Sequence, residues 1–153
     1  MQVSYSAESV LDSTISRNDL RVLLVYPNTR DVAMANLGFQ QVYSLLNKIE
    51  GVVCDRFAMP VGWKPETQSL NREELRSMDM QMHPLDFDVI AFSISFEPDY
   101  LNTVLALKYF GIPLDREERD ASFPMITAGG SAIFINPEPL AECMDVLFIG
   151  EGE

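Results

Sequence analysis

The sequence predicts an α/β fold built on a mainly parallel sheet of five strands. Short apolar runs rich in β-branched residues alternate with segments whose apolar residues recur at helical spacing. The run Phe87–Ser95, FDVIAFSIS, is almost continuously apolar, as expected of a strand covered on both faces of a parallel sheet. Together these observations predict strands that are joined by helical crossovers.

The segment 21–51 shows the pattern most clearly. Arg21–Pro27 is an apolar run of strand length, and the apolar residues of 39–49 recur on one helical stripe. Gly51 is expected to end that helix, because glycine adopts the left-handed conformation at low cost. The connection Asn28–Gly38 is too long for a minimal turn. Ligands of open α/β sheets bind outside the carboxyl ends of the strands, so this connection predicts a site.

The remaining chain continues the alternation. Further strands are expected at 52–57, 87–95, 124–128 and 146–149. A helix is expected over Pro98–Gly111, and another with Asn136 as its N-cap and Pro137 at its first position. The composition of 66–78 favours a helix, whereas 78–82 alternates as a short edge strand does, and the choice stays open.

Right-handed crossovers between these strands place helices on both faces of the sheet. The commonest five-stranded solution is the flavodoxin-like order 2-1-3-4-5. We therefore expect a three-layer, Rossmann/flavodoxin-like domain at 20–153, after a flexible leader at 1–19 with a short helix around 8–15. No helix follows the last strand to cover it, so we expect the chain to be the N-terminal fragment of a longer protein.

Composition narrows the function classes. The chain has 153 residues, 47% hydrophobic and 22% charged, which indicates one globular domain. With 11 basic and 23 acidic side chains the net charge is −12, which argues against nucleic-acid binding by this segment. No apolar run approaches the roughly 20 residues of a membrane span, and no signal peptide is visible, so we expect a cytoplasmic protein.

Neither a metal site nor a catalytic residue is predicted. Cys54 and Cys143 lie far apart, and His83 is the only histidine, so these residues cannot assemble a zinc or iron–sulfur site. No nucleophile–base pair is visible. Phosphate loops are excluded too, because neither GxxxxGK[ST] nor GxGxxG occurs.

Candidate binding residues follow three predicted strands. Ser93 and Ser95 either let the loop turn or offer hydroxyls to a planar ligand, and both interpretations stay open. Gly129-Gly130-Ser131 forms either a tight turn or a backbone surface against which a ligand lies. The first connection contributes four candidates, each of which also suits a turn or cap: Asn28, Asp31, Asn36 and Gly38.

Seven segments, in this order along the chain, carry a resemblance to a known family. They are Tyr26-Pro27, MANLGFQQVYSLLN (Met34–Asn47), CDRFAMP (Cys54–Pro60), DFDVIAFSISFEPDYLN (Asp86–Asn102), GIPL (Gly111–Leu114), AGGSAIFINPEPLAE (Ala128–Glu142) and IGEGE (Ile149–Glu153). With them the chain resembles the N-terminal cobalamin-binding-type domain of radical S-adenosylmethionine (SAM) proteins, and is most similar to an uncharacterised subfamily. The resemblance implies a cobalamin-holding module whose partner is its own C-terminal SAM-cleaving barrel.

Two departures qualify what the resemblance implies. Cobalamin domains of the methionine synthase type carry DxHxxG in the first loop, but aligning Asp31 with that motif puts Ala33 at the histidine and Asn36 at the glycine. No histidine of this loop then ligates cobalt. The family's Ser-x-Leu feature stands here as Ser93-Ile94-Ser95, while the glycine pair matches at Gly129-Gly130.

The second departure is the absence of CxxxCxxC, which holds the [4Fe–4S] cluster in the family. SAM and the cluster are therefore expected in a part outside this chain. Two alternatives remain: a ligand-free Rossmann-like lid or packing domain of the same enzyme, and an independent flavin- or nucleotide-binding domain.

Overall fold

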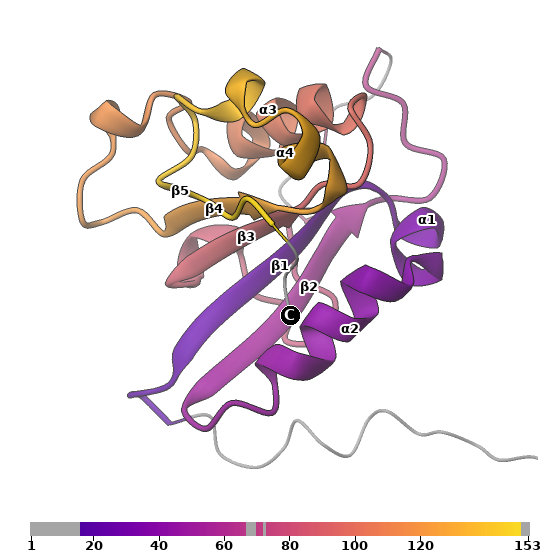
Figure 1. Ribbon diagram of the computed structural model, residues 1–153. Helices are drawn as coiled ribbons and strands as arrows, with labels where there is room; N and C mark the ends of the chain where they lie inside the picture. The colour runs from indigo at the N-terminus through magenta and orange to yellow at the C-terminus, as the bar shows by residue number, and fades with distance from the viewer. Residues whose placement is uncertain (1–15, 67–69, 72, 151–153) are drawn as a thin grey trace, which may run out of the picture.

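The computed structural model describes residues 16–66, 70–71 and 73–150 (Figure 1). The short helix expected around 8–15 lies outside the described residues. The elements in chain order are β1 (Leu20–Thr29), α1 (Arg30–Ala35), α2 (Leu37–Leu46), β2 (Val52–Met59), the 3-10 turn η2 (Pro84–Asp86), β3 (Val89–Ser93), α3 (Asp99–Phe110), the 3-10 turn η3 (Arg116–Glu118), β4 (Met125–Gly129), α4 (Ser131–Ile135), the 3-10 turn η4 (Glu138–Leu140) and β5 (Val146–Leu147).

The sheet confirms the predicted α/β class and strand order. Its five strands run in the order β2-β1-β3-β4-β5, and every neighbouring pair is parallel. In Figure 1, α1 and α2 lie on one side of the sheet and α3 and α4 on the other. All carboxyl ends of the strands therefore meet at one edge, which we call the carboxyl edge.

The two faces of the sheet carry separate cores. On the side of α3 and α4, which we call the α3 face, the buried strand residues are Leu23, Val25, Phe57, Met59, Ile90, Phe92, Ile126 and Ala128. On the side of α1 and α2, which we call the α2 face, they are Val22, Leu24, Tyr26 and Cys54, packed with Ala33 and Phe39. Strand alternation divides each strand between the two cores, as the period of two requires.

The first connection, Asn28–Gly38, is not a plain loop. It contains α1, and Asn36 then caps α2 by accepting a hydrogen bond from Phe39 N at 2.9 Å. The predicted end of the helix is wrong: α2 stops at Leu46, and Asn47 bonds to both the N–H and the carbonyl of Cys54. Gly51, at φ +77°, instead serves the turn into β2.

The fourth crossover differs from the prediction because proline acts on the residue before it. Asn136 is the C-cap of α4, not the N-cap of a later helix. Pro137 excludes the helical region for its predecessor, and Asn136 is extended at φ −148°, ψ 91°. Only the short turn η4 follows. The helix expected over Pro98–Gly111 is confirmed as α3, and Gly111 ends it at φ +77°.

The ambiguous segment 66–82 forms neither a helix nor a strand in its described part. Asn71 and Glu74 do make the reciprocal hydrogen bonds of a capping pair, but no helix continues from them. Further along, the Asp55 carboxylate accepts hydrogen bonds from the N–H groups of Asp79 and Met80, at 3.0 and 2.7 Å. These two hydrogen bonds hold the segment beside β2 without adding a strand. Two strands are also shorter than predicted: β3 ends at Ser93 and β5 at Leu147.

Candidate functional site

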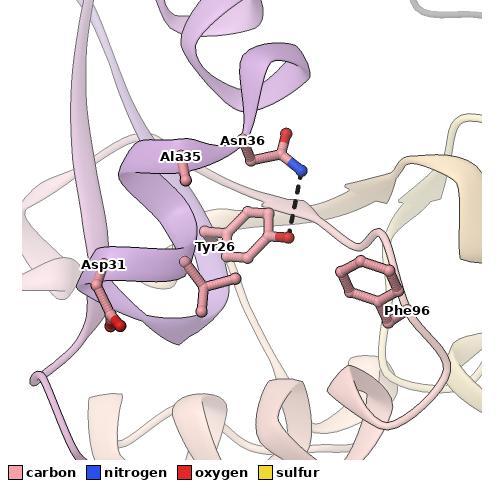
Figure 2. A pocket seen from close by; sticks show the side chains of 6 residues that line it. Tyr26, Asp31, Ala35, Asn36 and Phe96 are labelled. Atoms are coloured by element: carbon pink, nitrogen blue, oxygen red, sulfur yellow. Dashed lines mark hydrogen bonds between the residues drawn. The ribbon is translucent and has the colours of Figure 1, made fainter.

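Asn36 links three elements at the carboxyl edge. Its Oδ1 caps α2, while its Nδ2 donates to Tyr26 Oη at 3.3 Å and to Ser95 Oγ at 3.4 Å. Figure 2 shows the first of these side-chain bonds, with the Tyr26 hydroxyl directed toward the side where Phe96 stands. Ser131 Oγ then donates to the Ser95 carbonyl at 3.1 Å, which connects β1, β3 and the start of α4.

A shallow hollow of about 390 Å³ opens beside this network. Its wall is largely apolar, with one carboxylate at the rim, and Phe96 is 56% exposed there. The lining residues are Tyr26, Asp31, Val32, Ala35, Asn36 and Phe96 (Figure 2). A hydrogen bond from the Thr29 side chain lowers the pKa of the exposed Asp31 carboxyl, so the rim carries negative charge at neutral pH.

The Asn28 amide is already engaged by a residue that the sequence analysis did not select. Asn28 Nδ2 donates to Asp99 Oδ1 at 2.9 Å, and Asn102 Nδ2 donates to the same oxygen at 3.3 Å. The other Asp99 oxygen is buried without a hydrogen-bond partner. Burial raises the pKa of this carboxyl, and the two amides oppose the rise. The pair joins the end of β1 to the first turn of α3.

One glycine of the pair, Gly130, is required by the packing of the chain itself. Gly130 has φ +112°, and a Cβ there would lie 2.4 Å from the carbonyl oxygen of Ile94. The backbones of β3 and β4 continue to bond past their ends, since Ile94 N donates to Gly129 O at 2.8 Å. The tight-turn interpretation therefore accounts for Gly130, whereas Gly129 has an ordinary φ and faces the α2 face beside Ser93.

One half of the α2 face has no helix over it. The helices α1 and α2 lie over β1 and β2, and Figure 1 shows no described helix on that side of β3, β4 and β5. Most side chains of this half are half-buried or exposed, although β3 is a central strand; the exception is Thr127 of β4, which is 4% exposed. The half-buried and exposed residues form what we call the uncovered strip: Val89, Ala91, Ser93, Met125, Gly129, Val146 and Phe148.

Exposed apolar side chains gather where the strands end. Each follows β1, β3, β4 or β5 and belongs to α1, α2, α4 or a loop at the carboxyl edge. We call them the apolar rim: Val32, Met34, Leu37, Phe96, Phe134, Ile135, Phe148 and Ile149. Because soluble monomers rarely expose many large apolar groups together, such an edge is typical of a binding surface.

The residues present offer no histidine ligand at this edge. Ala33, which aligns with the cobalt-ligating histidine, is buried in α1. His83 precedes β3, where its Nδ1 accepts a hydrogen bond from Leu85 N at 3.2 Å. Burial raises the pKa of Cys54 to about 12, so this thiol is not a nucleophile. Across the described ranges, no three histidine, cysteine or acidic side chains are grouped to bind a metal ion.

The structure brings together some of the predicted candidates. Asn36, Ser95 and Ser131 form one network, Ser93 and Gly129 lie side by side on the uncovered strip, and Asp31 stands at the rim of the hollow. Gly38 lies in the first turn of α2, where a Cβ would meet only Asn36 Oδ1.

Sequence reasoning missed Tyr26, Phe96 and Asp99. Tyr26 was assigned to the first strand and to a segment of the family resemblance but not to the site, although it is the only residue of that apolar run with a hydroxyl. Phe96, an aromatic residue directly after a strand end, was the other available signal. Nothing local to Asp99 indicated its role, because its partner Asn28 is 71 residues away.

Comparison with known proteins identifies the family but supplies no close relative. None of the curated proteins and none of the solved structures matches this chain significantly. Within the described residues, no helix has the length and apolar character needed to cross a membrane. Residues 38–153, well over half of the chain, match the family described as radical SAM proteins, N-terminal. The chain belongs to this family.

Proposed function

We propose that this domain is the cobalamin-binding-type module of a radical SAM enzyme, with the cofactor lying across the carboxyl edge. The observation that carries the proposal is the composition of the uncovered strip near this edge. Ala91, Ser93 and Gly129 are small and adjacent, and no described helix covers them. A nucleotide tail can enter between a sheet and its neighbours only where side chains are this small.

Two bulky residues that could have closed such a slot do not lie on this strip. Phe92 is buried on the opposite face of the sheet, and Phe134 is exposed on α4. The slot is bounded on its outer side, because a Cβ on Gly129 would lie 3.4 Å from Phe148 Cβ. The proposed slot is therefore free of Phe92 and Phe134, and Phe148 narrows it beside Gly129.

The residues of the edge suit a large ligand that is apolar on its face and polar at its margin. The apolar rim would contact the corrin face, and the hydroxyls of Ser95 and Ser131 would bond to its amide side chains. When bound, cobalamin supplies methyl-transfer chemistry at cobalt. Since α1 offers Ala33 in place of a histidine, this chain would hold the cofactor without a ligand to the metal from that helix.

SAM and the [4Fe–4S] cluster belong, in this proposal, to a catalytic part that lies outside the chain. Cys54 and Cys143 are its only cysteines, and three thiolates are needed to hold a cluster that leaves one iron for SAM. The domain would thus bind the cobalamin and cover the catalytic part. That catalytic part would carry out the radical chemistry.

A ligand-free packing module is the second candidate, and the apolar rim favours it. Phe96, Phe134, Ile135 and Ile149 are exposed at the edge and would be buried directly against the catalytic part. The hollow is shallow and holds only about 390 Å³, which is small for a cofactor of the size of a corrin.

The experiment that separates these functions compares two ligands on the parent protein. Cobinamide has the corrin ring but lacks the nucleotide tail, so a tail that enters the slot makes cobalamin bind at least about tenfold more tightly. Equal affinities would contradict the placement of the tail. Binding of neither ligand would favour the packing module, and binding of a flavin or nucleotide instead would favour the third alternative.

A further inference from the structure

The thioether of Met34 lies between two hydrogen-bond donors. Met34 belongs to α1 and is 43% exposed at the apolar rim. Its Sδ accepts a hydrogen bond from Gln40 Nε2 at 3.4 Å, and Arg56 Nη1 donates to the same sulfur over a longer 4.0 Å. A thioether is a weak acceptor, so two donors that suit a strong acceptor meet a weak one here.

The orientation of the Gln40 amide is set by Arg56. Arg56 Nη1 donates to Gln40 Oε1 at 2.8 Å, and a guanidinium carries only N–H groups, so the amide must present its oxygen to it. Gln40 Nε2 therefore faces Met34 Sδ and the carbonyl oxygen of Ala33, the latter at 3.5 Å. The sulfur thus meets N–H groups and not the amide oxygen.

Arg56 is held in this position by two further contacts. Its guanidinium carbon lies 4.1 Å from the centroid of the Tyr43 ring, and its Nη2 forms an ion pair with Asp79 at 3.3 Å. The Arg56 side chain is only 15% exposed. The aromatic ring and the carboxylate stabilise a positive charge beside the sulfur. An oxygen bonded to this sulfur would meet a charged donor that is already in place, and charge-assisted hydrogen bonds are the strong ones.

Met125 is exposed to a similar extent but has no such donors. It is 50% exposed on the uncovered strip, and no N–H or O–H group of a described residue donates to its sulfur. Met59 and Met144, by contrast, are buried in the core. Exposure alone therefore does not distinguish Met34 from Met125, whereas the two donors do.

We propose that Met34 is an oxidation site whose sulfoxide oxygen is bound by Gln40 Nε2 and Arg56 Nη1. With hydrogen peroxide as the oxidant, the sulfur attacks one peroxide oxygen and the O–O bond breaks. The proton left on the transferred oxygen passes to the departing hydroxide and forms water. The sulfur loses two electrons, which reduce the peroxide, and the product is methionine sulfoxide. Its oxygen accepts the two hydrogen bonds that the thioether accepts only weakly.

The modification would change the apolar rim at one position. Sulfoxide formation turns a flexible apolar side chain into a polar one. The two donors come from α2 and β2, so the modified side chain would stay attached to both elements while the rim loses an apolar contact. The inference does not depend on which ligand or partner binds at the rim.

The test follows repair of the sulfoxide in the full-length parent protein. The protein is treated with hydrogen peroxide, freed of it, and incubated with the two methionine sulfoxide reductases that act on the two sulfoxide epimers. Peptide mass spectrometry then gives the repair rates at Met34 and Met125. A bound sulfoxide oxygen has to leave its donors before the reductase can act, so the donors should slow repair at Met34.

Gln40→Glu is the matched variant, because it keeps an acceptor for Arg56 and replaces the Nε2 donor by a carboxylate oxygen. We expect the sulfoxide at Met34 to be repaired at least about threefold faster in this variant than in the wild type. The rate at Met125 should be the same in both proteins. Gln40→Ala removes the donor without adding a charge, and it should accelerate repair at Met34 in the same direction.

Two results would overturn the proposal. Equal repair rates at Met34 in the wild type and in both Gln40 variants would show that the sulfoxide oxygen is not bound. Absence of the sulfoxide at Met34, at a peroxide concentration that oxidises free methionine, would show that the thioether is shielded and is not an oxidation site.

Discussion

The α3 face and the α2 face of one sheet are closed to different extents. On the α3 face, β1 to β4 contribute fully buried side chains, and α3 lies over them. On the α2 face, the buried apolar core lies over β1 and β2; burial falls to half at Val89 and Ala91, and on β4 only Thr127 is buried. A strand pattern that is apolar on both faces therefore does not by itself predict that the two faces are equally buried.

The largest loss of stability is expected for a substitution in the core of the α3 face. Phe92→Ala removes a fully buried ring and should lower the free energy of unfolding by about 3–5 kcal/mol. Met125→Ala, on the strip of the other face, should cost about 1 kcal/mol or less while that face is open. Urea unfolding of both variants tests the comparison. Similar losses would mean that the two faces are equally well packed in solution.

The next largest loss of stability is expected for a polar residue on the α3 face. Asp55 is buried, and its carboxylate accepts hydrogen bonds from the N–H groups of Arg56, Asp79 and Met80. Asp55→Asn turns one acceptor into a donor that faces these groups, and we expect a loss of about 3 kcal/mol. Asp88→Asn is the control: its exposed carboxylate accepts one bond, from Arg21 N, and the loss should stay near 1 kcal/mol or below. Urea unfolding measures both losses. Equal losses would contradict the conclusion that Asp55 holds the segment with Asp79 and Met80 beside β2.

A smaller effect on stability is expected at the Asp99 carboxyl, and the direction in which this effect changes with pH can be stated. Burial raises its folded pKa above the ordinary 3.8, so the folded state binds the proton more tightly than the unfolded state. Its contribution to stability therefore falls as the pH rises from about 3.8 through the folded pKa.

Asp99→Asn should remove this fall and leave stability at pH 7 unchanged or higher. Asp31→Asn is the control of opposite sign, because the lowered pKa of Asp31 adds stability that is lost as the pH falls below 3.8. Thermal unfolding between pH 3 and 8 distinguishes the two. A stability that rises with pH more steeply in the wild type than in Asp99→Asn would contradict the assignment.

The smallest change in stability, and the most specific change in binding, is expected on the open face. Ser93→Leu fills the slot beside Gly129 and should weaken cobalamin binding by at least about tenfold, or 1.4 kcal/mol, with little change in unfolding. Ser44→Leu, on an exposed position of α2, should leave both unchanged. An affinity unaffected by Ser93→Leu would place the tail elsewhere.

The fold was predictable where the pattern is long enough to have a period. Five strands, their order and the helix α3 followed from apolar runs and from crossover rules. The helices α1 and α4 were missed because six and five residues make less than two turns, too few to show a helical stripe. At Asn136, the following proline outweighed the capping preference.

The site was predictable only in part, for a different reason. Ser95 and Ser131 follow the ends of β3 and β4, and Asn36 lies in the connection after β1, so topology brings the three to one edge of the sheet. The role of Asp99 depends on Asn28, a partner 71 residues away, and no local pattern reports such a pair. Similarly, the interpretation of Gly130 was settled by the approach of Ile94, a contact between strands rather than a property of the glycine.

A visible-spectrum titration of the parent protein with hydroxocobalamin tests the central claim most directly. A histidine-free edge that holds the corrin and takes the nucleotide tail into the slot predicts a saturable shift to the base-off spectrum. No shift up to about 100 μM, which corresponds to binding weaker than about −5.5 kcal/mol, would contradict the cobalamin module and leave the packing module.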